Sequence, residues 1–125
     1  MTILDASAIL GLLLGEDRAG PVVGHLSDAA ISAVNLAEVV GKLDDVAMPA
    51  HVAADLMHRL NLRVVEFDEE QALIAGGLKR ETAHLGLSLG DRACLATGIA
   101  AGDRIVTLDR AWASLDIAVP ILVLS

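Results

Sequence analysis

The chain of 125 residues is 54% apolar and 21% charged, which fits a single compact domain, residues 1–125, with its own hydrophobic core. Its single cysteine, Cys94, excludes an intramolecular disulfide and a cysteine-rich zinc site, and no apolar run is long enough to span a membrane, so we expect a soluble, cytoplasmic protein. A net charge of −8 and an aromatic content of 2% argue against a general nucleic-acid binder, because such proteins neutralise phosphates with clustered cations or stack bases on aromatic rings.

The first third of the chain alternates short apolar runs with helix formers. Residues 2–5 predict a strand that ends on an acid, and residues 6–14 predict a helix. Gly20 and Pro21 mark a turn before a second helical stretch, which is expected to end near Leu26. Residues 29–33 are short and apolar, which is typical of a buried strand.

Helical patterns dominate the middle of the chain. One helix is predicted from about Asn35 to Val46, and Pro49 suits the first position of another helix that ends near Leu60. Residues 62–67 are rich in β-branched side chains and predict a strand. Helical periodicity then extends over residues 69–84.

The last third of the chain begins where Gly86 and Gly90 interrupt the helical pattern. Four elements follow in order: a helix over residues 91–101 that ends at Gly102, a strand over residues 104–108, a helical turn around Trp112, and a final apolar run over residues 121–124. Strands that are separated by helices need right-handed crossover connections. We therefore predict an α/β fold with a mostly parallel sheet of four to five strands, covered by helices on both faces.

Four acids fall at strand ends and helix starts. Asp5 and Asp109 each end a predicted strand, Glu38 lies in the first turn of the helix after the second strand, and Asp91 opens a helix. Strand ends and the starts of the following helices meet at one edge of an open α/β sheet, where ligands bind. We therefore expect the four carboxylates to gather at this edge.

A cluster of carboxylates points to metal chemistry. Two carboxylates about 4 Å apart repel each other by roughly 4 kcal/mol at an effective dielectric near 20, so an empty cluster takes up protons or a cation. Oxygen donors without histidine or cysteine favour a hard ion, Mg²⁺ or Mn²⁺, and its bound water can attack a phosphodiester in line. Such an ion would also offset part of the net negative charge.

A purely structural role is the alternative for each acid taken singly. Acidic and polar side chains at helix starts stabilise the helix by about 0.5–2 kcal/mol without any catalytic function. The four acids fit such positions as two N-caps, Asp5 and Asp109, and as parts of two capping boxes, Asn35 with Glu38 and Ser88 with Asp91. The catalytic hypothesis therefore depends on the joint placement of the acids.

Four sequence strings together resemble the PIN-domain family, and within it the VapC toxins of bacterial toxin–antitoxin pairs. The strings are ILDASAIL, SAVNLAEVV, LGLSLGDRACLA and IVTLDRAW, and the match runs from Asp5 to Trp112 in the family's order. The resemblance implies a three-layer α/β/α PIN-like domain and an endoribonuclease that needs Mg²⁺ or Mn²⁺. Its acidic catalytic and metal-binding residues would be Asp5, Glu38, Asp91 and Asp109.

The same resemblance implies partners for the chain. The substrate class would be structured RNA such as tRNA, and a VapB-like antitoxin would block the site. Apolar helices over residues 6–14 and 52–60 favour surfaces for a homodimer and for a higher toxin–antitoxin assembly. The segment over residues 42–49 is shorter than the family pattern, which affects the helical region that faces the RNA.

Polar residues near the acids are candidates for supporting roles. Ser7, Asn35 and Thr107 match the resemblance by position and are expected to orient the acids, although each also fits an ordinary backbone hydrogen bond, a cap or a strand position.

Four basic residues are candidates for substrate binding: Arg92 and Arg110, which adjoin two of the acids, and the pair Lys79 and Arg80. Salt bridges or the helix dipole are the alternative roles for these cations.

Two other functions remain open from the sequence. One is a catalytically silent PIN scaffold that binds proteins, against which stands the presence of all four acids. The other is a receiver domain, which would need a phosphoacceptor Asp after its third strand, whereas residues 68–70 look like a charged helix start.

Overall fold

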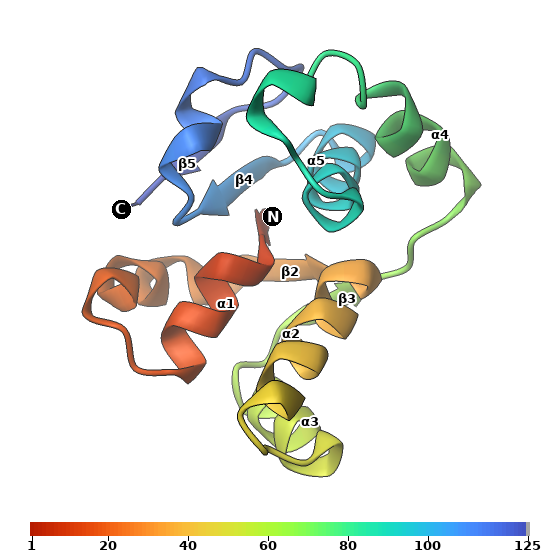
Figure 1. Cartoon of the computed structure of the whole chain (residues 1–125). Coiled ribbons are helices and arrows are strands. Elements are labelled where there is room, and N and C mark those ends of the chain that lie inside the picture. The colour runs from red at the N-terminus through yellow and green to blue at the C-terminus, as the bar shows by residue number, and fades with distance from the viewer. Residues whose placement is uncertain (125) are drawn as a thin grey trace.

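Five parallel strands form the centre of the computed structural model, which describes residues 1–124 (Figure 1). The strand order is β3-β2-β1-β4-β5, and all four pairings are parallel. The strands are β1 (Thr2–Leu4), β2 (Ala29–Ser32), β3 (Arg63–Val65), β4 (Arg104–Thr107) and β5 (Ile121–Val123). The predicted α/β class with a parallel sheet of four to five strands is confirmed.

Helices cover both faces of the sheet and make three layers. Figure 1 shows α1, α2 and α3 on one side and α4 and α5 on the other. The α-helices are α1 (Ala6–Leu13), α2 (Ala33–Asp45), α3 (Ala50–Arg59), α4 (Glu69–Gly77) and α5 (Leu89–Ala101). Three 3₁₀ segments join them: η1 (Asp17–Asp28), η2 (Ala83–Leu85) and η3 (Arg110–Ser114). No helix within residues 1–124 is long and apolar enough to cross a membrane.

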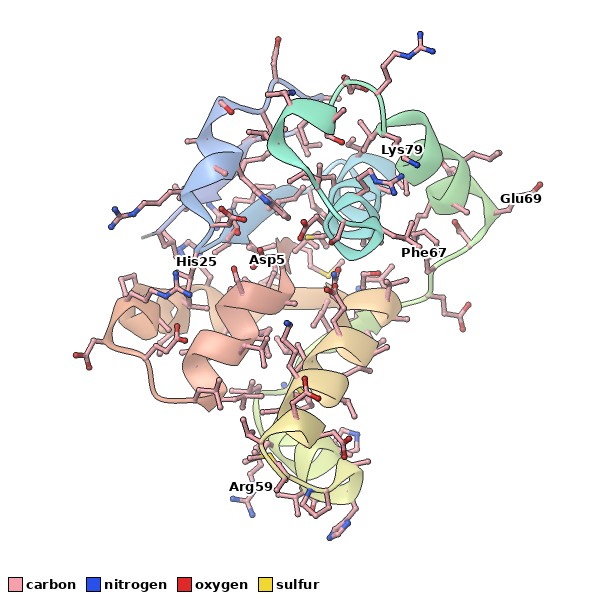
Figure 2. All side chains as sticks on the ribbon, viewed as in Figure 1. Asp5, His25, Arg59, Phe67, Glu69 and Lys79 are labelled. Atoms are coloured by element: carbon pink, nitrogen blue, oxygen red, sulfur yellow. The ribbon has the colours of Figure 1, made fainter. Side chains whose placement is uncertain are left out.

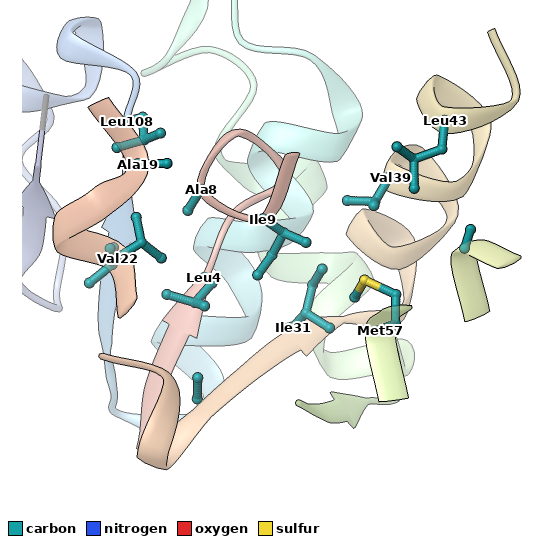
Figure 3. Close-up of a cluster of buried hydrophobic side chains, with 13 residues drawn as sticks. Leu4, Ala8, Ile9, Ala19, Val22, Ile31, Val39, Leu43, Met57 and Leu108 are labelled. Atoms are coloured by element: carbon teal, nitrogen blue, oxygen red, sulfur yellow. The ribbon is translucent and has the colours of Figure 1, made fainter. Parts of the chain in front are cut away.

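Alternation along the strands divides the core into two clusters. In β1, Leu4 joins the cluster under α1 and α2, whereas its neighbour Ile3 joins the cluster under α5, because successive side chains of a strand point to opposite faces. Figure 3 shows the first cluster, in which Leu4 and Ile31 lie among side chains of α1, η1 and α2. The second cluster contains Trp112, the only tryptophan, which is 1% exposed.

Four predicted helical segments differ from the structure by two residues or more. One is the helix predicted over residues 91–101, which begins two residues earlier, at Leu89, because the Ser88 hydroxyl caps it by accepting from the Asp91 amide (3.1 Å). Residues 17–28 form one 3₁₀ helix with Pro21 inside it, so the predicted turn at Gly20 and Pro21 is wrong, whereas the helical stretch predicted up to Leu26 lies within this 3₁₀ helix. The helix predicted over residues 69–84 ends at Gly77, since two consecutive glycines weaken it and only turns and the short η2 follow. The helix predicted from Asn35 begins two residues earlier, at Ala33, because the Ser32 hydroxyl caps it by accepting from the Val34 amide (3.2 Å).

Candidate active site

The carboxyl ends of β1 and β4 lie side by side, and an acid follows each strand. The strands pair in parallel, and the Asp5 amide donates to the Val106 carbonyl (3.2 Å). A pocket of about 350 Å³ at this edge is lined by Asp5, Glu38, Asp91 and Asp109 together, and we refer to it as the acidic pocket. The predicted gathering of the four acids is therefore confirmed, while their catalytic roles stay predictions.

Asp5 is the most enclosed of the four acids. It is 4% exposed, and Figure 2 shows it where α1 begins, in the middle of the molecule. The Ala8 amide donates to its Oδ1 (2.9 Å), so Asp5 caps α1 as the structural alternative predicted. The Ser7 hydroxyl lies 2.7 and 2.9 Å from the two carboxylate oxygens, and the Thr107 hydroxyl donates to Oδ2 (2.5 Å). Two hydroxyl groups therefore fix the orientation of this carboxylate.

Burial raises the pKa of Asp5 from 3.8 to about 6, because the charged carboxylate loses its hydration. Hydrogen bonds from Thr107, Ala8 and Ser7 lower the pKa in opposition, and the negative charge of Asp91 raises it further. A cation in the acidic pocket would stabilise the charged form of Asp5 and reverse this shift.

Thr107→Val is expected to raise the pKa of Asp5 above about 6, because valine keeps the shape of threonine but removes the hydrogen bond that lowers the pKa most. Carbon-13 NMR titration of the Asp5 carboxyl measures this shift. Thr82→Val is the control, since its buried hydroxyl donates to the Leu78 carbonyl away from the pocket (2.8 Å). An unchanged or lowered pKa in Thr107→Val would contradict the role assigned to this hydroxyl.

Glu38 is held by a residue on its own helix and faces the start of α5. The Asn35 amide group donates to Glu38 Oε1 (2.6 Å) and to the Gly90 carbonyl (3.0 Å), so one side chain joins α2 to α5. A Cβ atom at Gly90 would lie 2.2 Å from Glu38 Oε1, so a larger residue there would displace the Glu38 carboxylate. Asn35 is 1% exposed, and its Oδ1 has no hydrogen-bond partner in the described residues. The predicted capping box of Asn35 and Glu38 is wrong, because Ser32 caps the helix.

Asp91 and Asp109 each combine a cap with a place in the acidic pocket. Asp91 Oδ2 accepts from the Ser88 amide (3.0 Å) and the Ser88 hydroxyl accepts from the Asp91 amide (3.1 Å), which confirms the predicted capping box. Asp109 Oδ1 accepts from the Ala111 amide (3.0 Å), as predicted for an N-cap. Capping uses one oxygen of each carboxylate, so the other oxygen remains available to a ligand. The structural and catalytic roles are therefore compatible.

Comparison with known protein families assigns the chain that carries this acidic pocket to one of them. A family model for the PIN domain matches residues 2–118. The chain belongs to the PIN-domain family. A search of curated protein sequences finds no match to it.

Solved structures share the fold of this PIN domain at low sequence identity. A chain of a toxin–antitoxin complex from Klebsiella pneumoniae superposes with a TM-score of 0.79 at 17% identity, covering 100% of this chain and 98% of its own. VapBC2 from Rickettsia felis, bound to a promoter DNA fragment, has a TM-score of 0.77 at 17% identity and coverages of 99% and 98%. VapC20 of Mycobacterium tuberculosis, described as a sarcin-ricin loop cleaving toxin, has a TM-score of 0.74 at 17% identity and coverages of 96% and 99%.

The acidic pocket of this PIN domain is open rather than closed around a metal position. Within residues 1–124, no three His, Cys, Asp or Glu side chains come close enough to enclose an ion. The four acids at the pocket offer only oxygen donors. An open set of oxygen donors fits Mg²⁺, which keeps several of its water ligands, better than Zn²⁺, which takes a closed set of nitrogen and sulfur ligands.

The predicted basic residues differ in their distance from the acids. Arg110 lines a second pocket beside Asp109. Arg92 instead donates to the Ala75 carbonyl in α4 (3.0 Å), and its buried Nε has no partner in the described residues. Lys79 and Arg80 are exposed in the turn after α4 and line neither pocket. Of the four predicted basic residues, the structure therefore brings Arg110 alone to a pocket that an acid lines.

Three charged residues at the acidic pocket are absent from the sequence-based site. Glu16, Arg18 and Lys42 all line it. Lys42 lies four residues after Glu38, a spacing that predicts an ion pair on one helix face, yet no ion pair joins them in residues 1–124. No local signal marks Glu16 or Arg18, because the path of η1 beside α1 brings them to the pocket.

Proposed function

We propose that this PIN domain is a Mg²⁺-dependent endoribonuclease, with Mn²⁺ as an alternative ion, and the toxin of a VapC-type toxin–antitoxin pair. The acidic pocket carries the proposal, because it collects carboxylates from four separate segments around one opening. The PIN-family match and the likeness in fold to chains of toxin–antitoxin complexes support it.

The four acids would hold the ion, which supplies a water of lowered pKa and a positive charge that offsets the charge on the phosphodiester. Ser7 and Thr107 orient the Asp5 carboxylate through their hydroxyl groups. Asn35 orients Glu38 through its amide group. These fixed side chains lower the cost of reorganisation when the substrate binds, since their geometry exists before the reaction.

Structured RNA such as tRNA is the substrate class that we propose. The description of VapC20 as cleaving the sarcin-ricin loop supports structured RNA as a substrate of this fold. We do not propose recognition by stacking of RNA bases on aromatic rings, because the whole chain has one phenylalanine, one tryptophan and no tyrosine. Recognition would therefore depend on the RNA backbone and its shape.

The purified chain is expected to cut total RNA into discrete fragments with Mg²⁺, and to leave it intact with EDTA. Gel electrophoresis and end mapping of the fragments measure the cut sites. Adding Mg²⁺ back after EDTA is expected to restore cleavage, which separates loss of the ion from loss of folding. Intact RNA in every condition, with the protein folded and free of partners, would favour the catalytically silent binding module instead.

A VapB-like antitoxin and a homodimer within a higher assembly are the partners that we propose. An apolar groove of about 140 Å³ between α2, α3 and β3 supports a protein partner, because its lining includes Leu36, Val40, Met57 and the exposed Val64. Size-exclusion chromatography with light scattering measures whether the chain alone is a dimer.

The receiver-domain alternative is wrong. The observed strand order β3-β2-β1-β4-β5 differs from the 2-1-3-4-5 order of flavodoxin-like receivers. The match to the PIN family over residues 2–118 supports the same conclusion.

A further inference from the structure

A second pocket adjoins the acidic pocket and carries two arginines. It has a volume of about 340 Å³ and is lined by Ser7, Arg18, Leu108, Asp109 and Arg110. Three of these residues, Ser7, Arg18 and Asp109, also line the acidic pocket, so the two pockets meet along these side chains. Two guanidinium groups and one hydroxyl therefore lie directly beside a carboxylate of the acid set.

Arg18 is held at this junction by the backbone on either side of it. The Glu16 amide donates to the Gly11 carbonyl in α1 (2.8 Å), and the Ala19 amide donates to the Glu16 carbonyl (3.0 Å). Ala19 is 1% exposed in the first core cluster, and a Cβ at Gly11 would lie 2.9 Å from the Ala19 Cβ. The segment that carries Arg18 is thus packed closely against α1, although the Arg18 side chain is itself exposed.

The Arg18 guanidinium has one acidic partner and remaining donors. Its Nε donates to Glu16 Oε2 (2.8 Å), and both side chains stay accessible to solvent at 53% and 39%. The two terminal nitrogens of the guanidinium are not used in this bond, and they provide the paired donors with which arginine binds a phosphate. Glu16 therefore competes with an anion for Arg18.

We propose that this second pocket is a phosphate subsite, in which Arg18 binds an RNA backbone phosphate next to the one that is cut. The proposal rests on the ribonuclease function proposed above. Arg110 lines the same pocket and adds a second positive charge beside the phosphate oxygens. A chain with a net charge of −8 needs such local cations, because RNA must bring its phosphates up to four carboxylates.

Cleavage kinetics of the full chain on a short RNA that contains the mapped cut site test the subsite. Arg18→Ala is expected to raise KM roughly tenfold, with kcat changed by less than about twofold. The slope of log(kcat/KM) against log salt concentration is expected to become shallower by about 0.7, the value for one lost contact with a phosphate of a single strand. Arg59→Ala is the matched control, since this exposed arginine lies at the end of α3, far from Asp5 (Figure 2). Glu16→Gln is expected to lower KM two- to threefold, because it removes the competing carboxylate.

A neutral methylphosphonate next to the cut site identifies the phosphate. The methylphosphonate is placed in turn on each side of the cut site. At one of these two positions it is expected to raise KM for the unchanged chain and for Arg59→Ala. At the same position it is expected to leave the KM of Arg18→Ala unchanged. Equal KM values for Arg18→Ala and Arg59→Ala would overturn the subsite while the ribonuclease function stands. Weaker antitoxin binding by Arg18→Ala with unchanged RNA kinetics would assign the pocket to the protein partner and would also overturn it.

Binding measurements separate failure of the subsite from failure of the proposed function. If the unchanged chain cuts no RNA, fluorescence anisotropy of the labelled tRNA pool with Ca²⁺ present replaces the kinetics. Weaker binding by Arg18→Ala than by Arg59→Ala would then support phosphate binding without cleavage. Equal binding by the two variants would overturn the subsite.

Discussion

Asp5→Asn is expected to lower the rate of RNA cleavage roughly a thousandfold, which corresponds to about 4 kcal/mol of transition-state stabilisation. The variant removes the charge of the most enclosed acid in the pocket while it keeps the size of the side chain. Single-turnover cleavage of the mapped RNA at saturating Mg²⁺ measures the loss. Asp55→Asn is the control, because it makes the same chemical change at an exposed position on α3. Equal rates for the two variants would remove Asp5 from the active site.

The same substitution is expected to stabilise the metal-free protein near neutral pH. Below pH 3.8 Asp5 is protonated in both the folded and the unfolded chain, so it adds no penalty. Stability is lost as the pH rises through the folded-state pKa of about 6, because the unfolded chain releases the proton more easily. The full penalty above that pH is about 3 kcal/mol. Asparagine avoids this penalty because its side chain carries no charge. Part of the stabilisation is lost, because the amide NH₂ group replaces one of the two carboxylate oxygens that accept hydrogen bonds.

Thermal unfolding in EDTA, recorded from about pH 4 to pH 8, tests this effect. Asp5→Asn is expected to have a higher Tm than the unchanged chain at about pH 8, and this difference in Tm is expected to shrink as the pH falls towards about 4. Added Mg²⁺ is expected to raise the Tm of the unchanged chain and not that of the variant, since a ligand stabilises the state that binds it. A lower Tm for Asp5→Asn in EDTA near neutral pH would contradict the assigned burial penalty.

Gly90→Ala is expected to lower kcat between about tenfold and a hundredfold while Tm changes little. The new Cβ would lie 2.2 Å from Glu38 Oε1 and 2.4 Å from Glu38 Cδ, so the carboxylate must leave its position. Losing the bond from Asn35 destabilises the protein, and the better helix propensity of alanine, about 0.5–1 kcal/mol, offsets that loss. The displaced Glu38 would no longer face the pocket in its original geometry, which lowers the rate.

Cleavage rate and thermal unfolding are both measured for Gly90→Ala, with Gly76→Ala as the control. Gly76 lies in α4, and a Cβ there would meet nothing within 4 Å, so its kcat is expected to stay unchanged. Glu38→Asp shortens the side chain by one methylene and makes room for the Cβ. Gly90→Ala is therefore expected to cost less in the Glu38→Asp background than alone. Equal costs in both backgrounds would show that the effect does not pass through Glu38.

The strands and the joint placement of the acids could be predicted from the sequence because both follow from local patterns. Each strand is a short apolar run, and Asp5 and Asp109 come directly after such runs. Parallel pairing then places these strand ends at one edge, whatever the details of the loops. The caps of Asp5, Asp91 and Asp109 were predictable for the same reason, since capping depends on residues within one helical turn.

The features that sequence patterns missed depend on contacts between distant segments. Asn35 looks like a cap, but Ser32 fills that role, and the partner of Asn35 across the helix interface is 55 residues away at Gly90. Arg18 reaches the acidic pocket only because η1 packs against α1. The direction of Arg92 towards α4 likewise depends on how α4 and α5 pack, which no pattern within α5 specifies.

The burial of Trp112 gives the protein an intrinsic fluorescent reporter beside the acidic pocket. The Trp112 amide donates to the carbonyl of Asp109 (3.2 Å), the acid that caps η3, and the indole lies in the core cluster under α5. With no tyrosine and no second tryptophan in the chain, all of the emission excited at long wavelength comes from this one ring. Fluorescence of the unlabelled protein can therefore follow both unfolding of this half of the core and events at Asp109.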